Sequence, residues 1–330
     1  MKIKNCSLLA ITLFFLSPLS AQEMDKFYSI PFLKDHLGTR TFLKEIGFQE
    51  ITLRTPDRLT LSGLFLTRPD ATCNVIVCAG WFPGRKEGMA TFYALLPDDC
   101  NILFFDARGR GESEGPLLWK VWRYGINEYK DIIGAIAYIN KQNNLPIIIG
   151  GTCSGVFNAA HAIIALIKNN KLTQSHVKGL FFDSGWGSVV TMSQSSAIAN
   201  IKKYIGKTAK LLHGTHKNIK QSSLYKVCSS CALYCFKNIH FLCAKPLITQ
   251  YEHKTNLFDK IHQINLPILF IHSHDDTHAD IANAIKLSTL APNKQCWWIE
   301  KSSHAKHHLI HKELYKEKLI AFINSAIQAE

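Results

Sequence analysis

Acidic residues are absent from one long stretch of the chain. No Asp or Glu occurs between Ser184 and Tyr251. A stretch of one charge sign usually forms a solvated face, and it would also attract anionic lipid headgroups or an acidic substrate. No nucleic-acid-binding motif accompanies this charge, so the formal net charge of +13 does not indicate a nucleic-acid partner. The positive charges of the stretch come from nine lysines: Lys202, Lys203, Lys207, Lys210, Lys217, Lys220, Lys226, Lys237 and Lys245.

Near its N-terminus the chain has no apolar run long enough for a stable membrane span. The run Leu8–Leu16 is well short of the roughly 20 residues that a spanning helix needs. Lysines precede this run and small residues follow it up to Ala21, which is the pattern of a secretory signal peptide. We expect residues 1–21 to be removed and the mature protein to be periplasmic or secreted. An uncleaved N-terminal anchor is the alternative.

Cysteine is more abundant than methionine, and export changes what the cysteines mean. The chain has ten, and loss of Cys6 with the leader leaves nine. An odd number in an oxidising compartment implies at least one unpaired thiol, for which Cys153 is the natural candidate. Four other cysteines lie close together in the sequence, with a spacing that does not match paired zinc knuckles. Simple burial on one face of a helix is possible, and we favour disulfides of undetermined pairing. The four are Cys228, Cys231, Cys235 and Cys243.

The stretch Leu145–Ala160 organises the rest of the chain. A short apolar run rich in β-branched residues is typical of a buried strand, and the stretch beyond it favours a helix. Between them lies Gly-Thr-Cys-Ser-Gly, which is the nucleophile-elbow pattern G-x-S-x-G with Cys153 at its centre. The two glycines permit a sharp turn that leaves the central side chain accessible. Cys153 is therefore the candidate nucleophile.

Two other interpretations of this turn stay open. Ser154 is a neighbouring hydroxyl, but centring the pattern on it would require glycine where Thr152 and Val156 stand. The turn could also be an ordinary one that holds a buried structural cysteine, which is the commoner fate of a free cysteine.

Strands and helices alternate along most of the chain. This alternation predicts an α/β fold with a mostly parallel sheet and flanking helices. Cys78 and Cys296 lie in apolar strands and are expected in the core. An antiparallel hairpin is expected over 50–66, further strands over 74–78, 101–105, 145–150, 178–182, 267–271 and 296–299, and helices over 129–139, 156–167, 281–290 and 309–329.

The alternation stops after Asp183. Residues 184–264 are too numerous for a plain connection, so we expect a helical cap insertion, rich in lysine and cysteine, over the carboxyl ends of the strands. The predicted organisation is a leader over 1–21, the first part of the core over 22–183, the cap, and the second part of the core over 265–330.

Four motifs in order make residues 50–329 resemble the α/β-hydrolase superfamily. They are the opening hairpin, the tripeptide Ala79–Trp81 where that family often has His-Gly-Phe, the loop Asp106–Ser113, which is similar to its D-x-R-G-x-G-x-S loop, and the elbow. A cysteine-centred elbow also occurs in dienelactone hydrolases and acyl-CoA acyltransferases of this superfamily. Within the glycine-rich loop we expect structural roles only, with Asp106 pinning the loop and Arg108, Arg110 and Ser113 holding it.

The resemblance also implies a triad in the chain order nucleophile, acid, histidine. His272-Ser-His-Asp-Asp is similar to the family's H-G-x-x-D loop, with Ser273 in place of glycine, and this makes Asp276 the acid. Asp275 and Asp280 are alternatives, each of which could be a solvated loop carboxylate.

The base comes from the loop that follows the last strand. Ser-Ser-His304 resembles the family's histidine loop, and His307 and His308 are neighbouring alternatives that could be surface histidines. By resemblance, the backbone N–H groups of Trp81 and Ser154 would bind the oxyanion. The resemblance implies no cofactor and no metal.

These residues suit acyl transfer. A thiol with its ordinary pKa of about 8.5 is only partly ionised at neutral pH, so an adjacent imidazole and a helix N-terminus would favour the thiolate. Asp276 would orient the His304 ring and stabilise its cation. The sequence therefore predicts an exported hydrolase that cleaves a carboxylic ester or thioester of a small-molecule or lipid acyl substrate through Cys153, His304 and Asp276.

Three alternatives to ester or thioester hydrolysis remain. An acyltransferase would use the same thioester intermediate, and peptidase activity is also open on this fold. A non-catalytic binding domain is suggested by the departures from the family pattern at Ala79 and Ser273.

Overall fold

The computed structural model describes residues 36–81, 84–115, 125–195 and 245–329. The predicted leader, most of the predicted cap, eight of the nine lysines of the acid-free stretch and the Cys228–Cys243 cluster lie outside these ranges. Statements about structure below concern the described residues.

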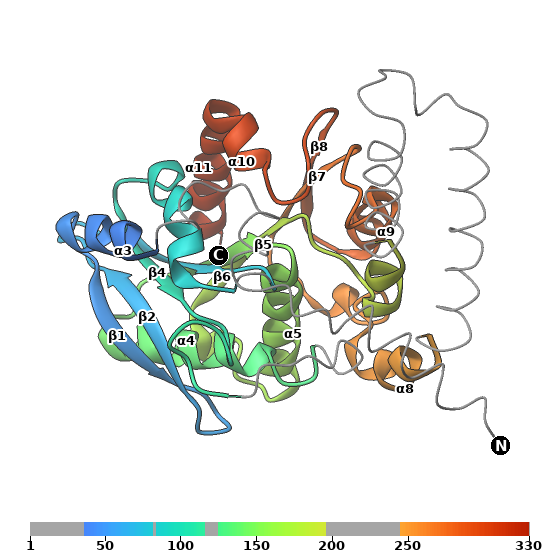
Figure 1. Ribbon diagram of the computed structural model, residues 1–330, viewed down its shortest axis with the longest axis horizontal. Helices are drawn as coiled ribbons and strands as arrows, with labels where there is room; N and C mark the ends of the chain where they lie inside the picture. The colour runs from blue at the N-terminus through green and yellow to red at the C-terminus, as the bar shows by residue number, and fades with distance from the viewer. Residues whose placement is uncertain (1–35, 82–83, 116–124, 196–244, 330) are drawn as a thin grey trace, which may run out of the picture.

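The core is an eight-stranded mixed sheet with the order β1-β2-β4-β3-β5-β6-β7-β8 (Figure 1). The hairpin β1–β2 is antiparallel and β2 pairs antiparallel with β4, while all the other neighbouring strands are parallel. The predicted fold class is thus confirmed. The strands are β1 Gln49–Arg54, β2 Thr60–Leu66, β3 Cys73–Cys78, β4 Cys100–Phe105, β5 Ile147–Thr152, β6 Val177–Asp183, β7 Ile268–Ser273 and β8 Lys294–Ile299.

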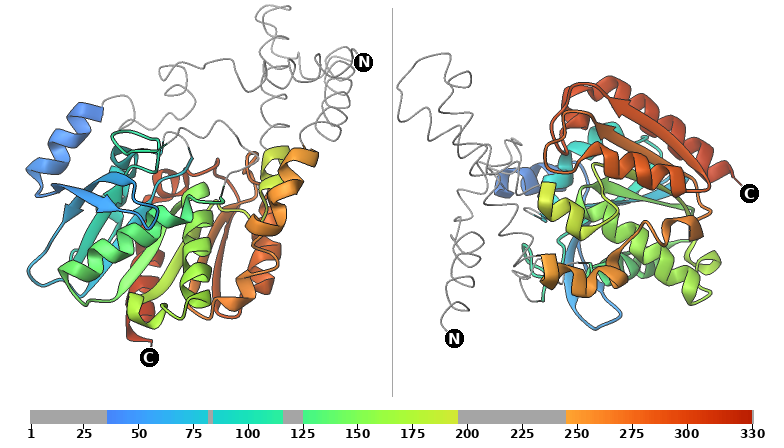
Figure 2. Two further views of the ribbon diagram at one scale, coloured as in Figure 1. Left: turned by 90° about the horizontal axis from the view of Figure 1, so that it is seen from below. Right: turned by 90° about the vertical axis from the view of Figure 1, so that its right-hand side faces the viewer.

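Helices cover both faces of the sheet. One layer contains α4 (Tyr129–Gln142), α5 (Ser154–Lys168), η7 (Ile261–Gln263) and α9 (Ile281–Leu290), and the other contains α3 (His36–Glu45), η2 (Lys86–Leu95) and α11 (Lys312–Gln328). In the right-hand view of Figure 2 the red α11 lies on one side of the sheet and the green α4 and α5 lie on the other. Further helices are η4 Thr173–Ser175, α8 Lys245–Thr255 and α10 His307–Ile310, and residues 189–195 are also helical.

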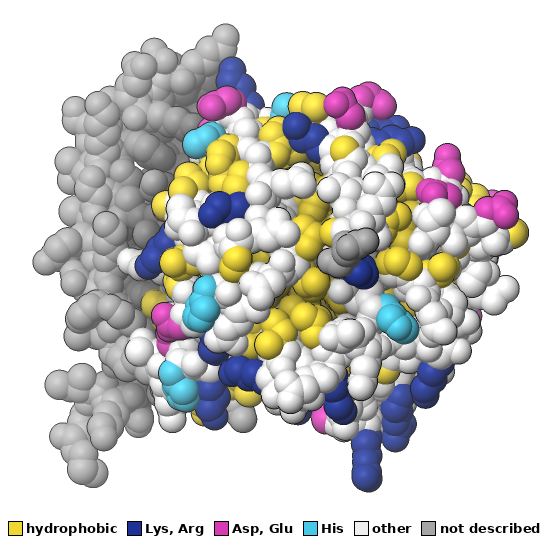
Figure 3. All heavy atoms as spheres, turned by 180° about the vertical axis from the view of Figure 1, so that it is seen from behind, with side chains coloured by type: hydrophobic (Ala, Val, Ile, Leu, Met, Phe, Trp, Pro, Cys, Tyr) yellow, Lys and Arg dark blue, Asp and Glu magenta, His cyan; other side chains and the backbone are white. Residues whose placement is uncertain are grey.

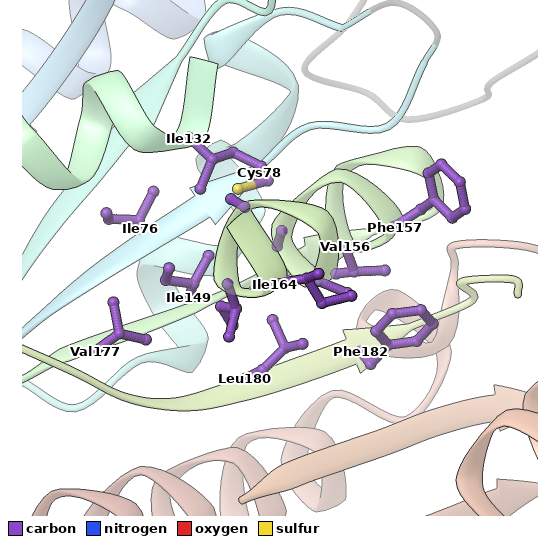
Figure 4. Close-up of a cluster of buried hydrophobic side chains, with 14 of the residues drawn as sticks. Ile76, Cys78, Ile132, Ile149, Val156, Phe157, Ile164, Val177, Leu180 and Phe182 are labelled. Carbon is purple, nitrogen blue, oxygen red and sulfur yellow. The ribbon is translucent and has the colours of Figure 1, made fainter. Parts of the chain in front are cut away.

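The central strands are mostly apolar because both of their faces are covered. In β3, Ile76 and Cys78 pack into the cluster beneath α4 and α5, whereas Val75 and Val77 pack into the opposite cluster. Successive side chains of a strand point to opposite faces, so a strand buried on both sides is apolar along most of its length. Figure 4 shows side chains of β3, β5 and β6 gathered around α5. Cys78 is buried as expected.

Two expectations about local structure are wrong. Cys296 is exposed, because it lies on β8, the edge strand of the sheet, whose first three side chains are all exposed. The helix expected over 309–329 is interrupted: α10 ends at Ile310, and His311 adopts non-helical angles (φ −116°, ψ 44°) before α11 begins. His307 and His308 of α10 are buried, and each lies within hydrogen-bond distance of a hydroxyl group. These contacts orient the short helix independently of α11.

Among the described helices, none is long and apolar enough to span a membrane. On the face shown in Figure 3, Lys and Arg side chains are spread around hydrophobic ones and do not form a single patch.

Candidate active site

The candidate catalytic side chains meet at the carboxyl edge of the sheet. Cys153 follows β5, Asp276 follows β7 and His304 lies in the loop after β8. These strands occupy neighbouring positions in the order β5-β6-β7-β8, so their carboxyl ends open at one edge. In open α/β sheets this edge is where ligands bind.

Cys153 occupies a strained turn between β5 and α5. Its backbone angles, φ 59° and ψ −126°, lie in a region that non-glycine residues rarely adopt. A side chain at Gly151 or Gly155 would overlap the carbonyl oxygen of Cys78 on the adjacent strand, and Gly151 also has a φ of 136°. Glycine is therefore required on both sides of Cys153, as the elbow pattern predicts.

The thiol is more accessible than the neighbouring hydroxyl. Cys153 is partly exposed, whereas Ser154 is the buried first residue of α5 and its Oγ has no hydrogen-bond partner among the described residues. Gly80, after β3, approaches the thiol so closely that a Cβ there would lie 3.6 Å from Cys153 Sγ. The backbone around Gly80 and Trp81 therefore borders the thiol.

His304 joins Cys153 to Asp276. Its Nδ1 lies 2.7 Å from Asp276 Oδ2, and its side chain is also hydrogen-bonded to Cys153. Burial by itself lowers the pKa of His304, but the negative charges of Asp276 and of the Cys153 thiolate outweigh it and raise this pKa well above its ordinary value. The imidazole is thus arranged to accept a proton on its cysteine side and to be stabilised as a cation.

Asp276 is held in place by backbone donors. Its Oδ1 accepts hydrogen bonds from the N–H groups of His278 and Ala279, each at 2.9 Å. Burial acts to raise the pKa of Asp276, but His304 and His272 lower it far below its ordinary range, so this carboxylate remains ionised.

The alternative acids are engaged elsewhere. Asp280 is the N-cap of α9, where its Oδ1 accepts the Ala282 N–H at 2.9 Å, and Asp275 is exposed. Neither has a recorded contact with His304.

The serine that replaces the family's glycine has a structural function. Ser273 is buried, and its Oγ accepts N–H groups from Ser302 at 3.0 Å and Asp275 at 3.2 Å. It therefore ties the Asp276 loop to the His304 loop. His272, the residue before Ser273, places its Nε2 3.2 Å from Asp276 Oδ2 and 2.8 Å from the Ala279 carbonyl oxygen.

His307 and His308 are not surface histidines. His307 is fully buried with its Nε2 2.8 Å from Ser184 Oγ, and His308 stacks on Phe92 with its Nε2 3.1 Å from Thr91 Oγ1. Burial is the main cause that lowers the pKa of each, and that of His308 falls to about 4. Both imidazoles are thus neutral, and Nε2 of each lies within hydrogen-bond distance of a hydroxyl.

The glycine-rich loop is held by its charged residues. Asp106 is buried and accepts hydrogen bonds from the backbone and side-chain nitrogens of Lys86 and from the Glu112 N–H. Arg108 pairs with Asp131 and Asp57. These contacts agree with the structural roles expected for Asp106 and Arg108.

Three residues near the triad were not anticipated from the sequence as site residues. The His278 ring stacks on that of His304, with centroids 5.5 Å apart and planes at 29°. Asp183 is the last residue of β6 and Ser184 follows it, between the strands that lead to Cys153 and Asp276. The only signal in the sequence was that a polar pair ends a predicted strand.

A metal site has no support in the part of the chain that the structure describes, which contains no cluster of three or more His, Cys, Asp or Glu side chains suited to an ion.

No protein-family model matches the sequence, and no curated protein is similar to it. Solved structures share its fold. An esterase of Pyrococcus furiosus superposes with a TM-score of 0.55 and 17% identity over 85% of this chain and 91% of its own. A proline iminopeptidase of Mycobacterium smegmatis gives 0.56 and 14%, over 84% and 99%.

The chain has an α/β-hydrolase-like fold. A membrane phospholipase A superposes with a TM-score of 0.58 and 14% identity. The superposition covers 99% of this chain and 98% of its own, more of this chain than the other two structures cover.

Proposed function

We propose that the protein is a hydrolase that cleaves carboxylic esters or thioesters through Cys153, His304 and Asp276. One observation carries this proposal: a cysteine in a strained, glycine-flanked turn is hydrogen-bonded to an imidazole whose other nitrogen lies 2.7 Å from a buried carboxylate. This is the arrangement of nucleophile, base and orienting acid that acyl transfer requires.

The first half-reaction forms an acyl-enzyme. His304 takes the thiol proton of Cys153, and Sγ attacks the carbonyl carbon of the substrate. The backbone N–H groups of Trp81 and Ser154 are proposed to bind the resulting oxyanion, in keeping with the approach of Gly80 to the thiol and the start of α5 at Ser154. As the tetrahedral intermediate collapses, His304 returns its proton to the departing alcohol or thiol, which leaves a thioester on Cys153.

The second half-reaction releases the acid. His304 removes a proton from water, the hydroxide attacks the thioester carbonyl, and Cys153 leaves as the thiolate and regains a proton from His304. Because a thioester is also readily attacked by amines, an acyltransferase is the alternative enzyme. Hydrolysis only, across a panel of amine and alcohol acceptors, would exclude it.

The acyl donor is proposed to be a small molecule or a lipid. The likeness to a phospholipase A along nearly the whole of both chains is the reason to include phospholipids in a substrate panel. Export, and attraction of the lysine-rich stretch to an anionic membrane surface, are further proposals that rest on sequence alone. If the second is right, binding to vesicles containing phosphatidylglycerol should weaken as salt rises.

The decisive test is covalent capture of the acyl group. The mature protein is exposed briefly to p-nitrophenyl acetate, and its intact mass and peptide map are compared with those of Cys153→Ala and of Cys296→Ser, which removes the other thiol exposed in the described chain. We expect one acetyl group, on Cys153, that is absent from Cys153→Ala alone. An unmodified Cys153 would favour a non-catalytic binding domain, and an adduct on Ser154 would assign the nucleophile to the hydroxyl.

A further inference from the structure

We infer that Ser184, supported by Asp183, is a positioning residue that sets the distance between the Cys153 thiol and the His304 ring. This inference rests on the proposed function, but its geometry is independent of the substrate. Neither residue belongs to the triad, and both are completely buried.

The pair Asp183–Ser184 is bonded to all three segments that carry the triad. The Asp183 carbonyl oxygen accepts the Cys153 N–H at 2.8 Å, which fixes the elbow. The Ser184 N–H donates to the Ile271 carbonyl oxygen at 2.9 Å in β7, the strand that leads to Asp276. Ser184 Oγ accepts the N–H of Ala305, the residue after His304, at 3.1 Å. One dipeptide therefore holds nucleophile, acid and base in register.

The Ser184 hydroxyl is fully used. Its O–H donates to Asp183 Oδ1 at 2.7 Å, and Oγ accepts from the Ala305 N–H and from His307 Nε2 at 2.8 Å. A hydroxyl offers one donor and two acceptor sites, so no site is left over. Among the described residues, no other side chain accepts the Ala305 N–H. The Ser184 hydroxyl therefore fixes the backbone of the His304 loop through this bond.

The carboxylate that orients this hydroxyl is itself anchored. Asp183 Oδ2 accepts the Tyr315 O–H at 3.0 Å, and burial, with the carboxylate beside it, raises the pKa of Tyr315 well above its ordinary value. Because the Ser184 O–H donates to Asp183, Oγ can only accept from His307, which assigns a proton to His307 Nε2. The network thus consists of donors and acceptors with assigned directions, which favours a single geometry.

The hydrogen bond from the Ala305 N–H to Ser184 Oγ joins two residues whose backbone angles are both unfavourable. Ser184 has a φ of 55° and Ala305 a φ of 53°, and this left-handed region is unfavourable for residues other than glycine. The backbone on both sides of the Oγ···H–N bond would relax toward other angles if the bond were lost. Because His304 adjoins Ala305, such relaxation would move its ring relative to Cys153 Sγ.

The test uses two variants that lack the hydroxyl and one matched control. Ser184→Ala removes it, and Ser184→Gly removes it while also relieving the positive φ, which protects folding. Ser188→Ala makes the same change at another buried serine of the same segment, whose Oγ accepts the Thr191 N–H and has no recorded contact with the triad segments. Two quantities are measured: kcat and KM for a short acyl thioester, and the pH dependence of Cys153 alkylation by iodoacetamide, followed on the Cys153 peptide.

We expect both Ser184 variants to lower kcat by about 10–100-fold with little change in KM, since a 1 Å misplacement can cost about 10²-fold. The rate of Cys153 alkylation at neutral pH should also fall, because a displaced imidazole removes the thiol proton less effectively. The Ser188→Ala control should match the wild type in both measurements. If a folded Ser184→Gly keeps the wild-type kcat and alkylation profile, the inference is wrong. Failure of the proposed function is a separate outcome, because it would appear as activity retained in Cys153→Ala.

Discussion

Replacing Asp276 by Asn tests the orientation of the base by changing one atom. Asp276 Oδ1 accepts two backbone N–H groups, and an amide oxygen can do the same, so the loop should keep its shape. Oδ2 instead faces His304 Nδ1 at 2.7 Å and His272 Nε2 at 3.2 Å, and in the variant this position becomes an NH₂ group. An NH₂ group cannot accept a hydrogen bond. His304 must then turn Nδ1 into the acceptor and carry its proton on Nε2, the nitrogen needed by Cys153.

The expected loss is therefore large in kcat and small in folding. The wrong imidazole tautomer costs about 10⁴-fold in turnover in the serine-protease triad, which corresponds to roughly 5.5 kcal/mol at 1.36 kcal/mol per tenfold. The loss of a hydrogen bond to a charged group should lower the free energy of unfolding by about 1.5–3 kcal/mol.

The assay is kcat for hydrolysis of a short acyl thioester, with urea unfolding as the measure of stability. Asp275→Asn and Asp280→Asn are matched controls, since one carboxylate is exposed and the other caps α9, a position where Asn serves as well as Asp. Both controls should stay within about threefold of the wild-type kcat. A loss of less than tenfold for a folded Asp276→Asn, or a loss above 100-fold for either control, would refute the assignment of Asp276 as the acid.

Three further results are expected. Gly155→Ala should lower the free energy of unfolding by about 3 kcal/mol in urea titrations, because the new Cβ overlaps the backbone oxygens of Cys78 and Ala79; a loss below 0.5 kcal/mol, on the scale of an ordinary surface change, would show that the elbow does not need this glycine. Burial lowers the pKa of His161 to about 3, so below pH 6.5 the unfolded chain binds a proton that the folded chain does not. The free energy of unfolding should therefore fall by about 1.5 kcal/mol between pH 6.5 and 5. His161→Gln should remove this decrease from the pH profile of stability. The Sγ atoms of Cys73 and Cys100 lie 2.8 Å apart at paired positions of β3 and β4, so refolding with oxidised glutathione, which takes up the two electrons, should join them and leave the buried Cys78 as a thiol; peptide mapping that finds both residues alkylated would contradict this pairing.

Much of the fold could be predicted from local patterns. Alternation around a tight turn predicted the two strands of the hairpin, and apolar runs predicted the other six. Central strands such as β3 and β5 give this signal because they are buried on both faces. The elbow could also be predicted from its glycines. A side chain at Gly151 or Gly155 would overlap neighbouring backbone, which explains why glycine flanks Cys153. The order Cys153, Asp276, His304 came from resemblance, and their meeting at one edge follows from the parallel sheet.

What local patterns could not supply is which side chains become neighbours across the sheet. Whether Cys296 is buried depends on β8 being an edge strand, and whether His307 faces solvent depends on how α10 packs. Ser184 and Ala305 lie 121 residues apart, and only the placement of β6 between β5 and β7 brings the pair Asp183–Ser184 against the triad loops. The sequence by itself determined the elements and the reactive groups, because periodicity and turn chemistry are local. Tertiary structure alone decided how those groups are held, because a hydrogen bond between distant residues leaves no periodic trace in the chain.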